Sequence, residues 1–434
     1  MKKRQIEFQS DVLNHIAGDI QLDQADHKKN EIIREAVRDV CRVHQQNQGE
    51  RQKPSYCADD KLQEQVRRVK SYGLLEQLLD DPDIEDIIIN GSGPVHAHIK
   101  GKGLQSLPCR IKDRAELDLL IKKLLVFGGK RSLDIINNVD LPGMRGRVNI
   151  VRSPQGPEVT ITKIKSRPFS IIDLLENQTL TDRMAALLWF YVEGMGIKPA
   201  NILVSGGPGA GKTTFLNALL EFIPADQHMV IVEDSLELRS EWIADVSRVE
   251  AEEDCSLKDL VKNSLRMRPD RIIVGEVRGE EARDMMTAMN IGKFCMGTVH
   301  AGTAKETIQR MESHPMNVPA SALNLIDIIV VLGRVSAEAS ARRVVTELAE
   351  TSNMETGRIA LSPLWRFRNA SAGFEELGPT VIFRDKLSRQ SGIENTEILN
   401  EIEQRRLFLN DLRKNQVRDI KEVYHACQGY LRRI

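Results

Sequence analysis

One segment of this chain limits its possible folds more than any other: the glycine-rich stretch from Gly206 to Thr213. It follows the pattern G-x-x-x-x-G-K-[ST], in which backbone N–H groups and a lysine surround the phosphates of a nucleoside triphosphate. The apolar run from Ile202 to Val204 precedes it, and apolar residues at helical spacing follow it over residues 216–223. The stretch therefore joins a strand to a helix, which indicates an α/β nucleotide-binding domain.

Each residue type in this loop has a chemical task. Lys212 is expected to reach the β and γ phosphates and the Thr213 hydroxyl to ligate Mg²⁺, so ATP and Mg²⁺ are the predicted cofactors. The helix that follows adds free N–H groups and the positive end of its dipole. A glycine-rich turn that fits the pattern by chance is the alternative, and the strand and helix around the loop argue against it. The predicted nucleotide-binding residues here are Gly206, Gly207, Pro208, Gly209, Ala210, Gly211, Lys212, Thr213 and Thr214.

Two further apolar strands end in acidic residues. The run from Met229 to Val232 leads to Glu233, and the run from Ile272 to Gly275 leads to Glu276. Because ligands gather at the carboxyl ends of strands in open α/β sheets, we predict that Glu233 and Glu276 are catalytic. Glu233 is the predicted Mg²⁺ ligand together with Thr213, and Glu276 either orients the attacking water, which we favour, or belongs to the metal shell. The structural alternative for both is a helix cap or a salt-bridged strand end.

A histidine follows the next short strand. Gly297, Thr298 and Val299 precede His300, and a helix is expected from about Glu280 to Met289. A lone histidine is more often structural than catalytic. However, the order phosphate loop, acidic strand end, Glu-ended strand and Thr-x-His resembles the Walker A motif, Asp box, Walker B motif and His box of the type II/type IV secretion ATPases. This resemblance implies that His300 is catalytic, as a sensor of the γ phosphate.

A second segment resembles the same family more specifically. The run from Leu265 to Gly279, LRMRPDRIIVGEVRG, is very similar to the family's L-R-x-R-P-D-x-I-I-V-G-E-V-R-G. Residues 84–91 resemble the start of the family's amino-terminal domain and residues 156–161 its end, so the resemblance covers about Leu75 to Glu350. By this resemblance the chain is identified as a member of the type II/type IV secretion (traffic) ATPase superfamily.

The branch within the family is read from other signals. The sequence has no tetracysteine zinc element, which extension and general secretion ATPases often carry. Residues 315–319, 325–330 and 342–347 look more like archaeal members. The resemblance therefore favours the tight-adherence (TadA/CpaF-like) branch or the archaeal pilus or archaellum branch.

The resemblance implies a fold, an activity and partners. The implied fold is α/β: a RecA-like P-loop NTPase domain with a smaller α+β amino-terminal domain and helical terminal segments. The implied activity is ATP hydrolysis by a homo-hexamer that powers assembly or secretion through a type IV pilus, Tad or type II secretion-like machine. The implied partner is an inner-membrane platform protein. The alternatives are a conjugation-type DNA or protein transfer ATPase and a nucleotide-gated scaffold that does not hydrolyse ATP.

Several positions depart from the family's pattern. Arg147 stands where the family places a nucleotide-facing basic residue, and we predict that it binds the nucleotide. Thr162 stands where the family often has an arginine, and residues 138–142 carry none, which weakens the expected clamp from the amino-terminal domain. Lys293 replaces a frequent histidine, and Gly302 replaces the usual asparagine. Because the four core motifs are whole, activity is still expected.

The pattern of apolar and turn residues along the chain predicts four segments. Residues 1–60 are polar and are expected to form a variable helical segment and a linker. Residues 61–165 are expected to form the α+β amino-terminal domain, with a helix from about Ala115 to Val126. Residues 166–367 are expected to form the RecA-like ATPase domain, and residues 368–434 a carboxy-terminal helical tail.

Composition limits the partners and the location. The net charge is −1 and aromatic residues make up 4%, so no direct contact with nucleic acid is expected. The six cysteines are far apart in the sequence and are expected to be reduced thiols. The first residues lack the apolar region of a secretion signal, and no run approaches the roughly eighteen apolar residues of a membrane helix. We therefore expect a cytoplasmic protein that is peripheral at the cytoplasmic membrane.

Overall fold

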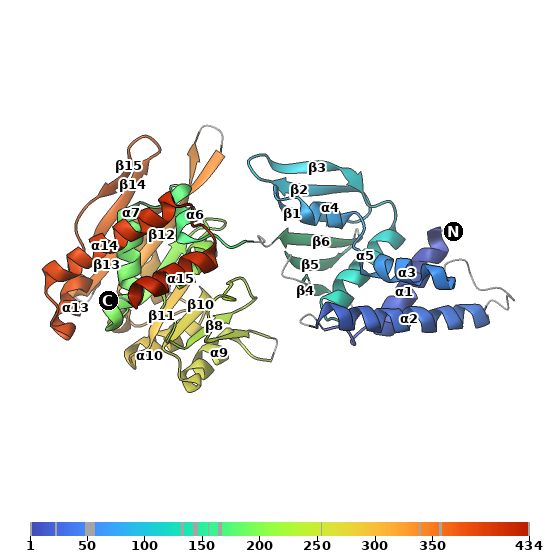
Figure 1. Ribbon diagram of the computed structural model, residues 1–434, viewed down its shortest axis with the longest axis horizontal. Coiled ribbons are helices and arrows are strands. Elements are labelled where there is room, and N and C mark those ends of the chain that lie inside the picture. Colours follow the sequence, from blue (N-terminus) through green and yellow to red (C-terminus); the bar gives the residue numbers. More distant parts are fainter. Residues whose placement is uncertain are drawn as a thin grey trace. The chain divides into compact units, whose positions relative to one another are not determined.

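The computed structural model describes residues 2–21, 24–47, 57–131, 134–141, 146–154, 156–163, 167–252, 254–337, 340–355 and 358–432. The chain divides into two compact units, Met1–Ser166 and Arg167–Ile434, each with its own β-sheet (Figure 1). The division falls at the predicted start of the ATPase domain, although residues 164–166 lie outside the described ranges.

The first unit is built on a six-stranded antiparallel sheet with the strand order β3-β2-β1-β6-β5-β4. Buried residues alternate with more exposed ones, as in β1, where Ile87 and Ile89 are fully buried, and in β5, where Val148 and Ile150 are buried. This period of two gives the sheet one core-facing side. The strands are β1 (Ile84–Asn90), β2 (Pro94–Ile99), β3 (Gly103–Arg110), β4 (Ile136–Asp140), β5 (Gly146–Ser153) and β6 (Gly156–Lys163).

The helices of the first unit complete the same core. They are α1 (Lys2–Ile16), α2 (Asp26–Asn47), the 3₁₀ turn η2 (Asp59–Lys61), α3 (Leu62–Lys70), α4 (Leu75–Asp80) and α5 (Arg114–Phe127). The last of these confirms the helix expected at about 115–126, and Asp113 caps it by accepting from the Glu116 N–H at 2.9 Å.

The first 60 residues, expected to form a variable helical segment and a linker, contain two helices that share the core of the first unit. Phe8 and Leu13 of α1, and Ile33 and Val37 of α2, are buried in one cluster with the strands of the sheet. These apolar residues recur at helical spacing within otherwise polar stretches, so each helix buries one narrow face. Part of the expected linker, residues 48–56, lies outside the described ranges.

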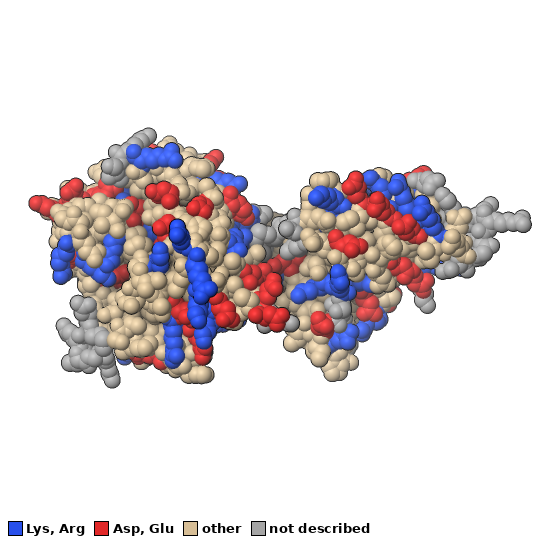
Figure 2. Space-filling view, turned by 90° about the horizontal axis from the view of Figure 1, so that it is seen from below, with Lys and Arg blue, Asp and Glu red and all other residues tan. Residues whose placement is uncertain are grey.

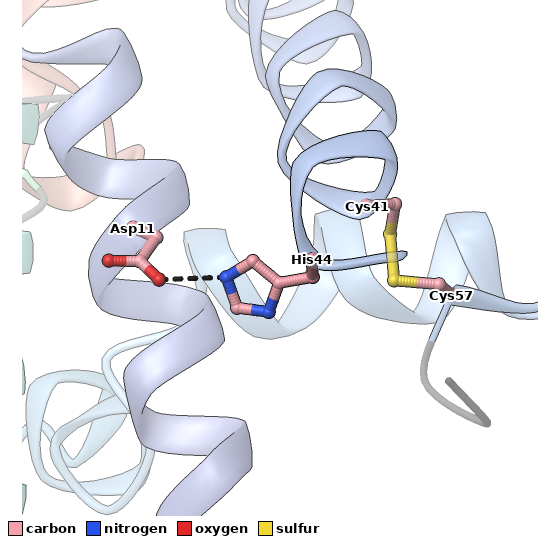
Figure 3. The surroundings of a disulfide bond; sticks show 4 residues. All are labelled: Asp11, Cys41, His44 and Cys57. Carbon is pink, nitrogen blue, oxygen red and sulfur yellow. Dashed lines mark hydrogen bonds and ion pairs between the residues drawn. A yellow bond between two sulfur atoms is a disulfide. The ribbon is translucent and has the colours of Figure 1, made fainter. Parts of the chain in front are cut away.

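A disulfide joins Cys41, near the end of α2, to Cys57 (Figure 3). The expectation that all six cysteines are reduced thiols is therefore wrong for this pair. The two cysteines are 16 positions apart in the sequence, but the chain returns to α2 and brings their Cα atoms to 5.5 Å. One turn along, His44 Nε2 lies 2.9 Å from Asp11 Oδ2 and links α2 to α1 (Figure 3). The free cysteines are Cys109, Cys255, Cys295 and Cys427.

The second unit is built on a nine-stranded sheet with the order β15-β14-β13-β12-β7-β11-β10-β8-β9. The six strands from β12 to β9 run parallel, and β13, β14 and β15 continue the sheet in antiparallel pairs. This order is RecA-like and confirms the α/β prediction. The strands are β7 (Ile202–Gly206), β8 (Met229–Glu233), β9 (Val246–Glu250), β10 (Arg271–Val277), β11 (Phe294–Val299), β12 (Ile328–Ala337), β13 (Ser340–Glu355), β14 (Arg358–Asn369) and β15 (Gly373–Glu376).

The parallel strands are buried on both faces. In β7, Ile202 and Val204 belong to one core cluster, while Leu203 between them belongs to another. The same alternation holds in β8, where Ile231 lies in the first cluster and Val230 in the second. Burial on both faces explains why these strands read as continuous apolar runs in the sequence.

Helices cover both faces of this sheet and extend to the end of the chain (Figure 1). The carboxy-terminal residues predicted at helical spacing are part of the first core cluster, including Ile398 of α14 and Val423 of α15, so these helices pack on the unit. The helices are α6 (Ile171–Glu176), α7 (Asp182–Glu193), α8 (Lys212–Leu219), α9 (Leu257–Ser264), α10 (Glu281–Asn290), α11 (Ala304–Glu312), α12 (Ala320–Leu323), α13 (Ile382–Ser391), α14 (Asn395–Lys414) and α15 (Ile420–Leu431), with 3₁₀ turns η4 (Gly194–Gly196), η5 (Leu220–Phe222) and η6 (Leu265–Met267).

Two surface properties bear on partners. Among the described helices, none combines the length and the apolar character needed to cross a membrane. On the face drawn in Figure 2, Lys and Arg side chains lie among Asp and Glu side chains in both units. This mixture on the visible face agrees with the net charge of −1.

Candidate nucleotide-binding site

The phosphate loop follows the central strand β7 and leads into α8. All five residues of β7 are buried, and α8 begins after Gly211 with no side chain capping its first turn. Gly206, Gly209 and Gly211 have φ angles of +156°, +68° and +92°, which favour glycine. A Cβ at Gly206 would lie 2.7 Å from the Leu332 carbonyl oxygen. The loop therefore has a shape that requires glycine at these positions.

The donors of this loop suit a polyphosphate. Lys212 is 8% exposed, and its Nζ lies 3.5 Å from the Gly207 carbonyl oxygen, so the ammonium group lies over the loop. That group and the N–H groups of the first turn of α8 are all donors, whereas phosphate oxygens are acceptors. Thr213 in the same turn offers a hydroxyl of the kind that Mg²⁺ takes beside phosphate oxygens and water. The residues present thus fit ATP with Mg²⁺.

Lys212, Glu276 and His300 come together beside the loop, and we call them the loop triad. His300 Nε2 lies 2.7 Å from Glu276 Oε1, and Lys212 Nζ lies 3.3 Å from each ring nitrogen of His300. The register of the parallel strands explains the meeting of Glu276 and His300. Val277 of β10 is opposite Val299 of β11. Glu276 directly precedes Val277, and His300 directly follows Val299. Sequence reasoning therefore named three residues that the fold brings into contact.

The charges in the loop triad act on one another. Burial lowers the pKa of His300, the Lys212 ammonium lowers it further, and Glu276 opposes both effects. Burial also lowers the pKa of Lys212, while Glu276 and then Glu237 raise it. His300 is therefore held toward its neutral form, in which one ring nitrogen donates and the other accepts. A hydrogen bond from Nε2–H to Oε1 then orients the Glu276 carboxylate.

Glu233, at the end of β8, is held by protein partners at both oxygens. Its Oε1 accepts from the N–H groups of Glu237 and Leu238, each at 2.8 Å, and its Oε2 lies 3.4 Å from Arg248 Nη2. The side chain is 2% exposed, and burial raises its pKa against the effect of these partners. These partners fit the structural alternative, a capped and salt-bridged strand end, and the role of Glu233 as a catalytic residue and Mg²⁺ ligand stays a prediction.

Glu237 is a residue of the site that the sequence reasoning missed. It lies close enough to Lys212 for its charge to raise the pKa of that lysine. The signal that marks it is a third acidic residue four positions after Glu233, in the same segment beyond β8. Asp234, between them, pairs instead with Arg278, whose Nη2 lies 2.6 Å from Oδ2.

The predicted Arg147 belongs to the first unit. It lies in β5, opposite Asp140 of β4 on one side and Thr162 of β6 on the other. Burial raises the pKa of Asp140, and the Arg147 charge opposes that shift. Residues 142–145, just before β5, lie outside the described ranges. Nucleotide binding by Arg147 therefore stays a prediction.

Comparison with known proteins places these features in context. Residues 104–357 match the family described as Type II/IV secretion system protein. The chain is 30% identical over 370 residues to the uncharacterized protein MJ0900 of Methanocaldococcus jannaschii, a match that spans 81% of this chain and only 66% of that protein. It is 30% identical over 241 residues to the conjugal transfer protein TrbB of Rhizobium radiobacter, covering 54% of this chain and 73% of TrbB. The crystal structure of the pilus retraction motor PilT with bound ADP aligns with a TM-score of 0.49 and 19% identity, over 77% of this chain and 91% of PilT.

Proposed function

Because the chain belongs to the Type II/IV secretion system protein family, we propose that it is an ATPase that hydrolyses ATP to drive a secretion or filament-assembly machine. The family match includes β7, the phosphate loop and all three members of the loop triad. The observation that carries the proposal is the loop triad itself. A structural phosphate loop would need a lysine, but it would need neither a carboxylate nor a histidine beside it.

The triad suggests how the reaction proceeds on this chain. Lys212 binds the β and γ phosphates. Glu276 orients the water that attacks the γ phosphorus and accepts its proton, while the bond from the γ phosphorus to the β–γ bridging oxygen breaks and ADP leaves. His300 holds the Glu276 carboxylate through Nε2 and also lies against Lys212. Its position between the two couples phosphate binding by Lys212 to the orientation of Glu276. When bound, Mg²⁺ would neutralise phosphate charge, with Thr213 as its protein ligand.

We further propose that the working form is a homo-hexamer at the cytoplasmic face of a membrane, where it pushes on an inner-membrane platform protein. The support for this part is the resemblance of the sequence motifs to the secretion ATPases. Loss of the γ-phosphate contacts at the loop would be converted into displacement by rigid-body motion of the two units. Neutral charge and few aromatic residues support protein rather than nucleic-acid partners.

A conjugation-type transfer ATPase is the second candidate, and the identity to the conjugal transfer protein TrbB favours it. The assignment to the tight-adherence or archaeal pilus branch depends on the resemblance of short segments such as residues 315–319 and 342–347. The two candidates share the ATPase chemistry and differ in the partner. Affinity purification from the native cell distinguishes them, since a pilin and a polytopic platform protein support the first and a relaxase or coupling protein the second.

The ATPase proposal is tested by steady-state phosphate release from the purified protein with Mg²⁺ and ATP. Lys212→Ala is expected to abolish nucleotide binding or turnover. The matched control is Lys262→Ala, which removes an exposed lysine on α9 of the same unit and should leave the rate unchanged. His300→Ala should keep ATP binding and lose the coupling of γ-phosphate contact to turnover. Nucleotide binding with no phosphate release by the wild-type protein, alone or with platform protein, would instead support the nucleotide-gated scaffold.

A further inference from the structure

The hairpin formed by β12 and β13 passes directly beside the phosphate loop. In the pairing of β12 with β7, Leu332 is opposite Gly206, the first residue of the loop. Beyond that point β12 has no partner in β7 and pairs only with β13, out to Ala337 opposite Ser340. From Gly333 onward the two strands of the hairpin therefore extend past the end of β7, where the phosphate loop begins. Residues 338 and 339 lie outside the described ranges.

Two arginines of this hairpin lie beside Gly209 and Gly211 of the phosphate loop. Arg343 Nε donates to the Gly209 carbonyl oxygen at 2.9 Å, and its Cδ lies 3.1 Å from where a Cβ on Gly211 would be. Arg334 Nη1 lies 3.6 Å from where a Cβ on Gly209 would be. Both side chains are exposed, so their guanidinium groups are accessible beside the loop. The absence of side chains at the two glycines makes this approach possible.

The charge arrangement of the pair is unfavourable by itself. Arg334 and Arg343 are directly opposite each other in the antiparallel register, and like charges at such positions are destabilising. Within the described part of the chain, no carboxylate forms a salt bridge with either of them. The neighbouring Arg342 has no acidic partner there either, and its Nη2 donates to the Gln178 carbonyl oxygen at 3.1 Å. The two positive charges beside the loop, Arg334 and Arg343, thus form no salt bridge with a carboxylate of the described residues.

We propose that Arg334 and Arg343 bind the phosphate chain of the nucleotide held by the phosphate loop of the same subunit. The inference rests on the proposed function, because it assigns further residues to that nucleotide site. Polyphosphate is the anion that this loop is built to hold, and a planar guanidinium binds phosphate oxygens in pairs. Arg343 uses Nε for the loop and has its two Nη groups for the ligand. Arg334 and Arg343 then neutralise the phosphates from the side of the loop opposite to the loop triad.

The test uses the full-length protein and equilibrium binding of fluorescent derivatives of ATP, ADP and AMP. The variants are Arg334→Ala, Arg343→Ala and the double variant. The matched control is Arg366→Ala, an exposed arginine on β14 of the same sheet. A charge-assisted contact of this kind corresponds to a change of roughly tenfold or more in affinity. We expect at least tenfold weaker binding of ATP and ADP for each single variant, a small change for AMP, and no change for Arg366→Ala.

Conservative variants and the oligomeric state sharpen the result. Arg343→Lys should recover part of the ATP affinity, because it keeps the charge and loses the paired donors. Unchanged ATP and ADP affinity in the double variant, with binding abolished in Lys212→Ala, overturns the inference and leaves the proposed function standing. Equal losses for ATP, ADP and AMP also overturn it, because the arginines would then contact the nucleoside or α phosphate that all three share, and not the β and γ phosphates that Lys212 holds. A third result would also overturn it: ATP affinity that falls only in variants whose oligomers dissociate, as measured by light scattering. The two arginines would then bind a neighbouring subunit.

Discussion

Removal of the Arg405 guanidinium is predicted to destabilise the second unit strongly. Arg405 of α14 is 1% exposed, and its Nη2 donates to Glu193 Oε2 of α7 at 2.7 Å. Its Nε donates to Glu401 Oε1 at 2.9 Å, and its guanidinium carbon lies 5.1 Å from the centre of the Trp189 ring. Arg405→Ala would therefore leave the Glu193 carboxylate, itself 7% exposed, buried without its cation.

The size of the effect follows from this burial. Removal of one partner from a buried ion pair costs about 3–5 kcal/mol, because the remaining charge is left without compensation. Loss of the contact with the Trp189 ring adds about 1 kcal/mol. A typical domain is stable by only about 5–15 kcal/mol, so the change should be a large part of the total. Glu401 is 14% exposed, belongs to the same helix and leaves Arg405 paired with Glu193, so Glu401→Ala should cost less than Arg405→Ala.

The assay is equilibrium unfolding in urea, followed by tryptophan fluorescence. All three tryptophans, Trp189, Trp242 and Trp365, lie in the second unit, so the signal reports on that unit alone. The control is Arg413→Ala on the same helix, expected to stay within about 0.5 kcal/mol of wild type. The double change Arg405→Met with Glu193→Leu should lose less than Arg405→Ala, since the buried Glu193 carboxylate is removed together with its cation. If Arg405→Ala unfolds at the urea concentration of the Arg413→Ala control, the reasoning is refuted.

Two further predictions concern the first unit. Alkylation of the unfolded, unreduced chain should label four thiols, and six after reduction, because Cys41 and Cys57 are joined; six labels without reductant would contradict the disulfide. Burial lowers the pKa of Lys123 from 10.5 to about 8, so the folded unit binds fewer protons than the unfolded chain between these values. Stability should therefore rise with pH from about 8 to about 10.5, and Lys123→Met should remove that rise. Pulse proteolysis in urea at pH 7.5 and 10, scored by cleavage before residue 166, measures the stability of the first unit. An identical rise in stability in Lys123→Met would show that Lys123 is not its cause.

The parts of the fold that depend on local pattern were predictable from the sequence. The phosphate loop, the apolar strands β8 and β10, and the helix α5 are each marked by residues adjacent in the chain. The pairing of Glu276 with His300 was also accessible, because both residues lie at the carboxyl ends of parallel strands, β10 and β11, which are neighbours in the sheet. Their contact follows from the register once the strand order is known.

The features that the sequence did not reveal depend on contacts between distant segments. Arg343 is 134 positions from Gly209, and no local pattern connects them. The disulfide depends on the chain returning to α2, and the core role of α1 depends on packing against residues far along the chain, such as Leu124 of α5. Glu233 illustrates a different limit. Its position at a strand end is common to metal ligands and caps, and its two backbone donors are apparent only in the folded structure.

The most direct test of the central claim, that the loop triad hydrolyses ATP, is a comparison of ATP affinity with turnover in Glu276→Gln. The substitution keeps the shape of the side chain and removes the charge that orients the water. The control is Glu280→Gln, an exposed carboxylate just after β10. The account predicts ATP affinity close to wild type and a turnover rate lower by roughly a hundredfold or more, with both quantities unchanged in the control. A turnover rate equal to wild type in Glu276→Gln would contradict it.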